Sequence, residues 1–232
     1  MTDEKTKAKR ERAAALRRKA KNRERLRQLG VYGAFALVIV GLIAGAAVAI
    51  NNAGSDATPP TSVDLTTASG QGASTTPPWS LPADVPARVK AAGLNLGAMG
   101  TAEHYHAHLD ILIDGKPVGV PANIGIDPNN GAMSAVHTHT DDGVIHVEAA
   151  TKGQTFTLGQ LFTQWNVRLS VTQIGSFADG NGNSFQAYIN GKEISTDPAM
   201  IRLSERQQIA LVYGPEGAKV TVPDSFKFGE GL

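Results

Sequence analysis

The sequence predicts an α+β fold, in which one mostly antiparallel sheet is covered by a helix, at the end of a membrane-anchored chain. Three observations lead there: an uncharged apolar run at 31–50, strict side-chain alternation over 105–113, and a helical apolar stripe after Thr157. A β-grasp-like arrangement fits this order of elements. The roughly 150 residues of the last part of the chain are enough to bury a sizeable core.

The N-terminal part predicts a single membrane span. Residues 31–50 carry no charge, and as a helix rising about 1.5 Å per residue they would cross the roughly 30 Å hydrocarbon layer. Residues 1–30 hold twelve Lys/Arg against four Asp/Glu, whereas the rest of the chain holds ten against seventeen. The positive-inside rule therefore places residues 1–30 in the cytoplasm and everything after the span outside the cell membrane. A cleaved signal peptide is the alternative.

The remaining chain divides into a linker and a globular domain. Residues 51–78 are rich in Pro, Thr, Ser and Gly, which predicts a flexible tether. Residues 79–232 have a globular composition and form the expected extracytoplasmic domain. The basic tail is expected to contact anionic lipid, at about 1 kcal/mol per basic residue, and not nucleic acid. Because the chain has no cysteine, disulfides and thiolate metal sites are excluded.

The first half of the domain reads as a helix followed by strands. Asp84-Val85-Pro86 predicts the start of a short helix that ends by Gly93, because Pro suits the first helical turn and Gly follows helix ends. A strand over 105–113 leads through a two-residue Asp114-Gly115 turn into a return strand over 117–124. Another strand is expected at 144–148.

The second half is predicted to contain the covering helix. Thr157 and Gln160 form a capping-box pattern. The apolar residues after it follow the spacing of one buried helix face: Leu158, Leu161, Phe162 and Trp165. Further strands are expected over the ranges 167–174, 185–189, 208–213 and 219–222.

The histidines carry most of the functional information. All six lie between residues 104 and 146, and the other 189 residues contain none. Strand alternation places His104, His106, His108 and Asp110 on one face, opposite the apolar core residues. His146 and Glu148 share a face in the same way, and His137 and His139 come from a Gly- and Asp-rich segment. If the two strands are neighbours, these side chains can surround an ion.

The predicted ligand set is therefore nitrogen-rich, and it comprises His104, His106, His108, His137, His139, His146, Glu148 and Asp110. Imidazole with a carboxylate favours Zn or Cu, with Fe and Mn also compatible, whereas calcium and magnesium prefer all-oxygen shells. Ordinary histidines would release such an ion between roughly pH 7 and 5, because protons compete for the same nitrogen atoms.

Three functions fit these observations. The first is a membrane-tethered protein that captures, buffers, senses or delivers a transition metal. The second is a metal-dependent hydrolase or oxidoreductase, which needs an open coordination position and a general base. The third is a cell-envelope interaction module that binds a protein partner and no metal. A shell of four protein ligands favours the first function, and three ligands plus water favour the second.

Overall fold

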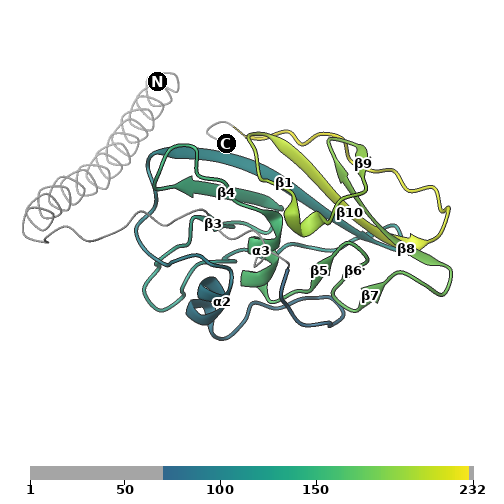
Figure 1. Ribbon diagram of the computed structural model, residues 1–232, viewed down its shortest axis with the longest axis horizontal. Helices are drawn as coiled ribbons and strands as arrows, with labels where there is room; N and C mark the ends of the chain where they lie inside the picture. The colour runs from purple at the N-terminus through teal and green to yellow at the C-terminus, as the bar shows by residue number, and fades with distance from the viewer. Residues whose placement is uncertain (1–69, 230–232) are drawn as a thin grey trace, which may run out of the picture. The chain divides into compact units, whose positions relative to one another are not determined.

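The computed structural model describes residues 70–229 (Figure 1). The expected cytoplasmic tail, the membrane span at 31–50 and most of the linker lie outside these residues. Within 70–229, no helix has the length and apolarity needed to cross a membrane. The described chain combines a mixed sheet with two α-helices, which confirms the α+β class.

The main sheet has seven strands, and its centre is a parallel pair. β1 (Glu103–Ile113) runs parallel to β10 (Gln207–Pro215), and the other pairings are antiparallel. The strand order is β3-β4-β1-β10-β8-β9, with β2 paired to β1. The remaining strands are β2 (Lys116–Pro117), β3 (Val136–His137), β4 (Val144–Ala149), β8 (Asn183–Ile189) and β9 (Lys192–Ile194).

The first hairpin is only partly as predicted. Asp114 and Gly115 both have positive φ, 51° and 71°, as a two-residue type I′ turn requires. The return strand, however, is limited to Lys116–Pro117 instead of extending over 117–124. Pro117 and Pro121 lack the N–H that a ladder needs, which favours an early end to the strand. The freed segment turns away and later contacts Thr138.

Both predicted helices are present. In α2 (Val85–Ala91) the Asp84 side chain accepts a hydrogen bond from the Ala87 N–H at 2.9 Å. In α3 (Leu158–Trp165) the Thr157 N–H donates to Gln160 Oε1 at 3.0 Å. The four residues of the predicted stripe are fully buried. They join the core face of β1, so α3 covers one side of the sheet.

The second half of the chain departs from the prediction in two places. Residues 167–174 form a hairpin instead of one strand: β5 (Leu169–Ser170) pairs with β6 (Gln173–Ile174), which pairs with β7 (Phe177–Ala178). Leu169 and Ile174 are both buried although their spacing is odd, and Val171 is 52% exposed. A single strand cannot bury both residues on one face, so the chain turns between them. Residues 219–222 belong to no strand.

Residues 70–78, at the end of the expected tether, pack on the folded domain. Gly70 and Ala73 form backbone bridges to Leu169 and Val167. The following residue, Trp79, is buried, and its ring meets Trp165 edge-on at 5.5 Å between centroids. The folded part therefore includes residues that composition alone assigns to a linker.

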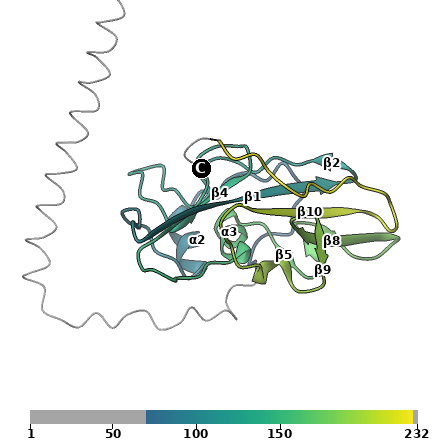
Figure 2. The same cartoon turned by 90° about the horizontal axis from the view of Figure 1, so that it is seen from above.

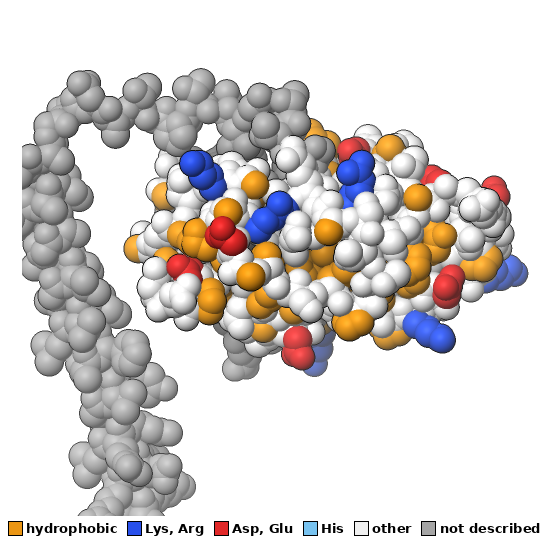
Figure 3. Space-filling view, turned by 90° about the horizontal axis from the view of Figure 1, so that it is seen from below, with side chains coloured by type: hydrophobic (Ala, Val, Ile, Leu, Met, Phe, Trp, Pro, Cys, Tyr) orange, Lys and Arg blue, Asp and Glu red, His pale blue; other side chains and the backbone are white. Residues whose placement is uncertain are grey.

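The two sides of the sheet are covered differently. α2, α3 and the β5–β7 sheet lie on one side, and the chain after β10, drawn in yellow, returns along the other (Figures 1 and 2). The surface around α2 and β5–β7 mixes apolar and charged groups and shows no histidine (Figure 3). The histidines lie on the side of the sheet that α3 does not cover.

Candidate metal centre

Strand register aligns three histidines across the sheet. His106 of β1 is paired with His146 of β4, and His146 is paired with His137 of β3. In the next row His104 is paired with Glu148. Directly paired residues project from the same face with Cβ atoms about 5 Å apart. The expectation that the two histidine-bearing strands are neighbours is therefore confirmed.

Four residues on this face form the first group that could hold an ion. One ligand atom each from His137, His139, His146 and Glu148 lies within 4.8 Å of the others. His137 Nε2 is 3.1 Å from His139 Nε2 and 4.0 Å from Glu148 Oε1. The group offers three imidazoles and one carboxylate, which are ligand types that zinc binds tetrahedrally and Cu²⁺ binds in tetragonal geometry.

A second group shares one histidine with the first. His104, His106 and His146 also place one ring nitrogen each within 4.8 Å of the others. His106 Nε2 is 3.1 Å from His146 Nδ1, and His104 Nε2 is 3.6 Å from Glu148 Oε1. Five of the six predicted histidines thus gather around His146 and Glu148.

Burial keeps the inner imidazoles unprotonated. Burial lowers the pKa of His146 to about 3, and the positive charge of a protonated His106 would lower it further. Burial lowers the pKa of His137 to about 4, against a hydrogen bond to the Ser134 carbonyl that acts the other way. The pKa of His106 is also lowered, mainly by burial and then by His104. Neutral imidazole is the form that binds a metal, so these nitrogen atoms are available at neutral pH.

The buried carboxylate of Glu148 has poorly compensated negative charge. The residue is only 6% exposed, and its Oε2 is buried without a hydrogen-bond donor. Its Oε1 faces His104 and His137 at 3.6 Å and 4.0 Å, which are beyond hydrogen-bond length. A buried carboxylate without partners is costly unless a cation compensates it. A metal ion among the surrounding imidazoles would supply that compensation.

The His137-Thr138-His139 segment is held by contacts to α3 and to the loop after β2. Ser134 Oγ and Gln164 Nε2 of α3 both donate to the Val136 carbonyl, at 2.6 and 3.0 Å. Thr138, fully buried, donates to the Pro121 carbonyl at 2.8 Å. Because neighbouring residues of an extended chain point to opposite sides, anchoring Thr138 turns both flanking histidines toward the site.

The orientation of His137 is fixed from outside the group. Its Nδ1 lies 2.9 Å from the Ser134 carbonyl, which can only accept a hydrogen bond. The proton of the neutral ring therefore sits on Nδ1, and Nε2 presents a lone pair toward His139 and Glu148. Metal-binding histidines are commonly oriented in this way by a carbonyl on the other ring nitrogen.

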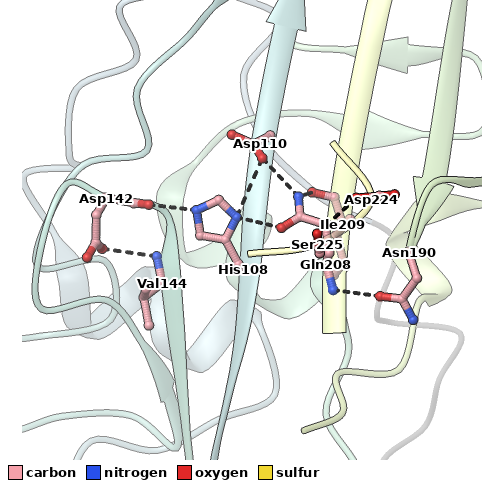
Figure 4. Close-up of polar contacts among 9 residues, drawn as sticks. All are labelled: His108, Asp110, Asp142, Val144, Asn190, Gln208, Ile209, Asp224 and Ser225. Atoms are coloured by element: carbon pink, nitrogen blue, oxygen red, sulfur yellow. Dashed lines mark hydrogen bonds and ion pairs between the residues drawn. The ribbon is translucent and has the colours of Figure 1, made fainter. Parts of the chain in front are cut away.

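His108 and Asp110, predicted as ligands, lie outside both groups. His108 Nδ1 faces Gln208 Oε1 at 2.9 Å, and its Nε2 faces the Asp142 carbonyl at 2.8 Å (Figure 4). Gln208 Nε2 donates to Asp110 Oδ2 at 2.9 Å. Both nitrogen atoms of His108 thus have protein oxygen partners. This network ties β1 to β10 and to the Asp142 loop, and it turns both ring nitrogens toward protein oxygens and away from the other histidines.

The C-terminal segment closes the face over His108. The Phe226 ring is stacked on His108 at 3.7 Å between centroids and 8° between planes. Phe228 is buried and contacts Phe226 edge-on, while the Arg206 guanidinium lies 5.5 Å from the Phe228 ring centre. The C-terminal segment therefore covers this polar strand face around His108. The face stays open near His104 and His139, which are exposed.

Sequence reasoning missed the residues that support the histidines. Ser134 and Gln208 contact His137 and His108 across 3 and 100 residues of sequence, and Gln164 holds the Val136 carbonyl across 28 residues. Gln164 lies in the helix next to the apolar stripe, but no periodicity marks it as a partner of β3. Gln164 and Gln208 are too distant in sequence from their partners to leave a local signal.

The comparisons with known proteins returned no match: no family model, no curated protein and no solved structure resembles this chain.

Proposed function

We propose that the chain is a membrane-anchored, extracytoplasmic protein that binds a transition metal, for capture, buffering, sensing or delivery. One observation carries the metal-binding part: four ligand atoms from His137, His139, His146 and Glu148 lie within 4.8 Å of one another. The unpartnered Oε2 of Glu148 supports it, because it leaves a buried negative charge for a cation to neutralise. The anchor rests on the uncharged run at 31–50 and the charge step across it.

The donor set favours Zn²⁺ or Cu²⁺. Three imidazole nitrogens and one carboxylate oxygen match borderline-soft ions, while Fe²⁺ and Mn²⁺ are compatible with the same set. Calcium is disfavoured because it takes six to eight oxygen ligands in proteins. The copper ion has the higher affinity for a given nitrogen and oxygen site, so supply in the envelope decides which ion is carried.

A shell of four protein ligands favours holding an ion over catalysis. Catalytic zinc sites keep a position for water or substrate, whereas structural and storage sites are closed by protein. Here the fourth ligand is the buried Glu148. Partner recognition at the exposed rim, around His104 and His139, would suit a protein that receives the ion or passes it on.

A metal-dependent enzyme is the second candidate, because the site is accessible on one side. The side chain of His104 is 51% exposed, and it lies 3.6 Å from Glu148 Oε1. If Glu148 left the ion, water could take its place and the carboxylate could act as a general base. A rapidly exchanging water on the bound ion would favour this function.

The test is a melting experiment on the full-length protein after chelator treatment. At pH 7.5, micromolar Zn²⁺ or Cu²⁺ should raise the melting temperature, because an ion that binds only the folded state stabilises it by mass action. The same concentration of Ca²⁺ should leave it unchanged. A melting temperature indifferent to all three ions would contradict the proposal and favour a metal-free interaction module.

A further inference from the structure

The two histidine groups overlap at His146. Its ring belongs both to the set with His104 and His106 and to the set with His137, His139 and Glu148. Its Nδ1 lies 3.1 Å from His106 Nε2, and its ring centre lies 4.6 Å from that of His139. An ion bound in either group therefore has ligands of the other group within reach.

The two groups differ in depth. The group of His104, His106 and His146 has the half-exposed His104 at its edge and contains no carboxylate. The group with Glu148 also has one exposed histidine, His139, but it adds the fully buried His137 and the carboxylate of Glu148, which is 6% exposed. The group at His104 is therefore the outer position, and the group at Glu148 is the inner position. The carboxylate gives the inner position the stronger attraction for a cation.

Charge limits the pair to one ion at a time. The combined site has five imidazole ligands and a single carboxylate, that of Glu148. Two dications a few ångströms apart repel four times as strongly as two unit charges. Sites that hold two ions at such distances use bridging anionic ligands, and one carboxylate does not neutralise two dications.

We propose that a single ion enters at the outer position and passes to the inner position by ligand exchange, with His146 bound throughout. This inference rests on the proposed metal-binding function. In the transfer, the ion exchanges the imidazoles of His104 and His106 for the ligands of the inner group. No electron is transferred, because the step only breaks and forms bonds between the ion and imidazole nitrogen or carboxylate oxygen. The outer position is a transit site.

The proposal has a kinetic signature that separates the two positions. A transit site lies on the path in both directions, so it accelerates loading and release by the same factor and leaves the dissociation constant unchanged. A ligand of the final site acts differently: its loss raises the dissociation constant, chiefly through faster release. His104 and His139 are both exposed histidines at the rim of the site, so they form a matched pair of positions for substitution.

The experiment is stopped-flow Zn²⁺ binding to the full-length protein, with release followed by transfer to a chelating dye. His104→Ala should slow both loading and release by about tenfold, within the range over which association rates vary among variants of one interface. Its dissociation constant should change by less than about twofold. His139→Ala should weaken Zn²⁺ binding by roughly 100-fold, mainly through faster release. Glu103→Gln, adjacent to His104 but on the other strand face, controls for local charge and should match the wild type.

Three results would overturn the transit site. One is two Zn²⁺ ions bound per chain at saturation. Another is a weaker dissociation constant in His104→Ala with an unchanged loading rate, which makes His104 a ligand of the final site. The third is wild-type kinetics in His104→Ala. A wild-type protein that binds no Zn²⁺ or Cu²⁺ would instead remove the proposed function itself, so the two failures are distinguishable.

Discussion

Replacing Glu148 by glutamine should affect stability and metal binding in opposite directions. The carboxylate is buried, and its Oε2 has no donor, so the metal-free protein holds a poorly compensated negative charge. Glutamine has nearly the same shape and no charge. Glu148→Gln should therefore leave the metal-free protein as stable as the wild type or more stable, because a buried polar group without a partner costs about 1–3 kcal/mol, and more when charged.

The same substitution should weaken metal binding by roughly 100-fold. Binding free energies of four-ligand zinc sites are about 10–16 kcal/mol, which is roughly 3 kcal/mol per ligand when divided among four. A 100-fold loss of affinity lowers the stabilisation by excess Zn²⁺ by about 2.7 kcal/mol. For a protein of this size that is about 5–10 °C of melting temperature. The magnitude assumes that the ion occupies the group of His137, His139, His146 and Glu148.

Thermal melts of chelator-treated full-length protein, with and without Zn²⁺, measure both effects. Glu193→Gln is the matched control, because Glu193 is an exposed carboxylate on β9 at the far edge of the sheet. The control should behave as the wild type in both conditions. A Glu148→Gln protein that melts several degrees lower without metal, and keeps the full shift with Zn²⁺, would refute the reasoning. Glu148 would then be a structural carboxylate.

Three further predictions concern His108, acid and topology. His108→Ala should lower the unfolding free energy by about 2–4 kcal/mol, because it leaves Gln208 and a stacked Phe226 without their partner, yet change Zn²⁺ affinity by less than about threefold; a large affinity loss in a binding titration would place His108 in the metal shell. Burial lowers the pKa of His137 to about 4 and that of His146 to about 3. As the pH falls, the unfolded chain therefore binds protons at these histidines before the folded chain does. The free energy of unfolding is full above about pH 6.5 and falls as the pH drops toward 4 and 3. Protonation of each of these two histidines in the unfolded chain should lower the free energy of unfolding of the metal-free protein by about 2 kcal/mol at pH 5. Urea unfolding that gives the same free energy of unfolding at about pH 7.5 and about pH 5 would contradict this. A reporter fused after Leu232 should be active only outside the cytoplasm, and activity confined to the cytoplasm would overturn the proposed topology.

The low pKa values of the buried histidines also change the pH at which metal binding is expected to be lost. Histidines with ordinary pKa values would lose an ion between roughly pH 7 and 5. With the pKa of His137 near 4 and that of His146 near 3, protons compete with the ion for these two ligands only at lower pH. Metal retention should therefore extend to about pH 5 or below. Burial, which a sequence shows only through neighbouring apolar residues, produces this difference.

Local patterns predicted the elements that depend on neighbouring residues. Alternation over 105–113 and the Asp114-Gly115 pair predicted β1 and its turn, because strand parity and positive φ are properties of adjacent residues. The capping box at Thr157 predicted α3 for the same reason. The odd spacing of Leu169 and Ile174 contained the signal for a hairpin, but the apolar content of 167–174 obscured it.

Long-range arrangement could not be predicted in this way. The parallel pairing of β1 with β10 joins segments about a hundred residues apart, and nothing in either strand specifies its partner. That pairing places Gln208 beside His108, which lies outside the two groups of possible metal ligands. Parity correctly put His106, His146 and Glu148 on one face. It could not distinguish a histidine whose ring nitrogen faces other histidines from one whose two ring nitrogens both face protein oxygens.

The central claim is that the group around His146 and Glu148 holds one transition-metal ion. Equilibrium dialysis of full-length protein against micromolar Zn²⁺ or Cu²⁺ with millimolar Ca²⁺, followed by elemental analysis, tests it most directly. We predict one transition-metal ion per wild-type chain, no bound calcium, and almost no metal in a His139→Ala/Glu148→Gln double variant. Equal metal content in the wild type and the double variant, or none in either, would contradict it.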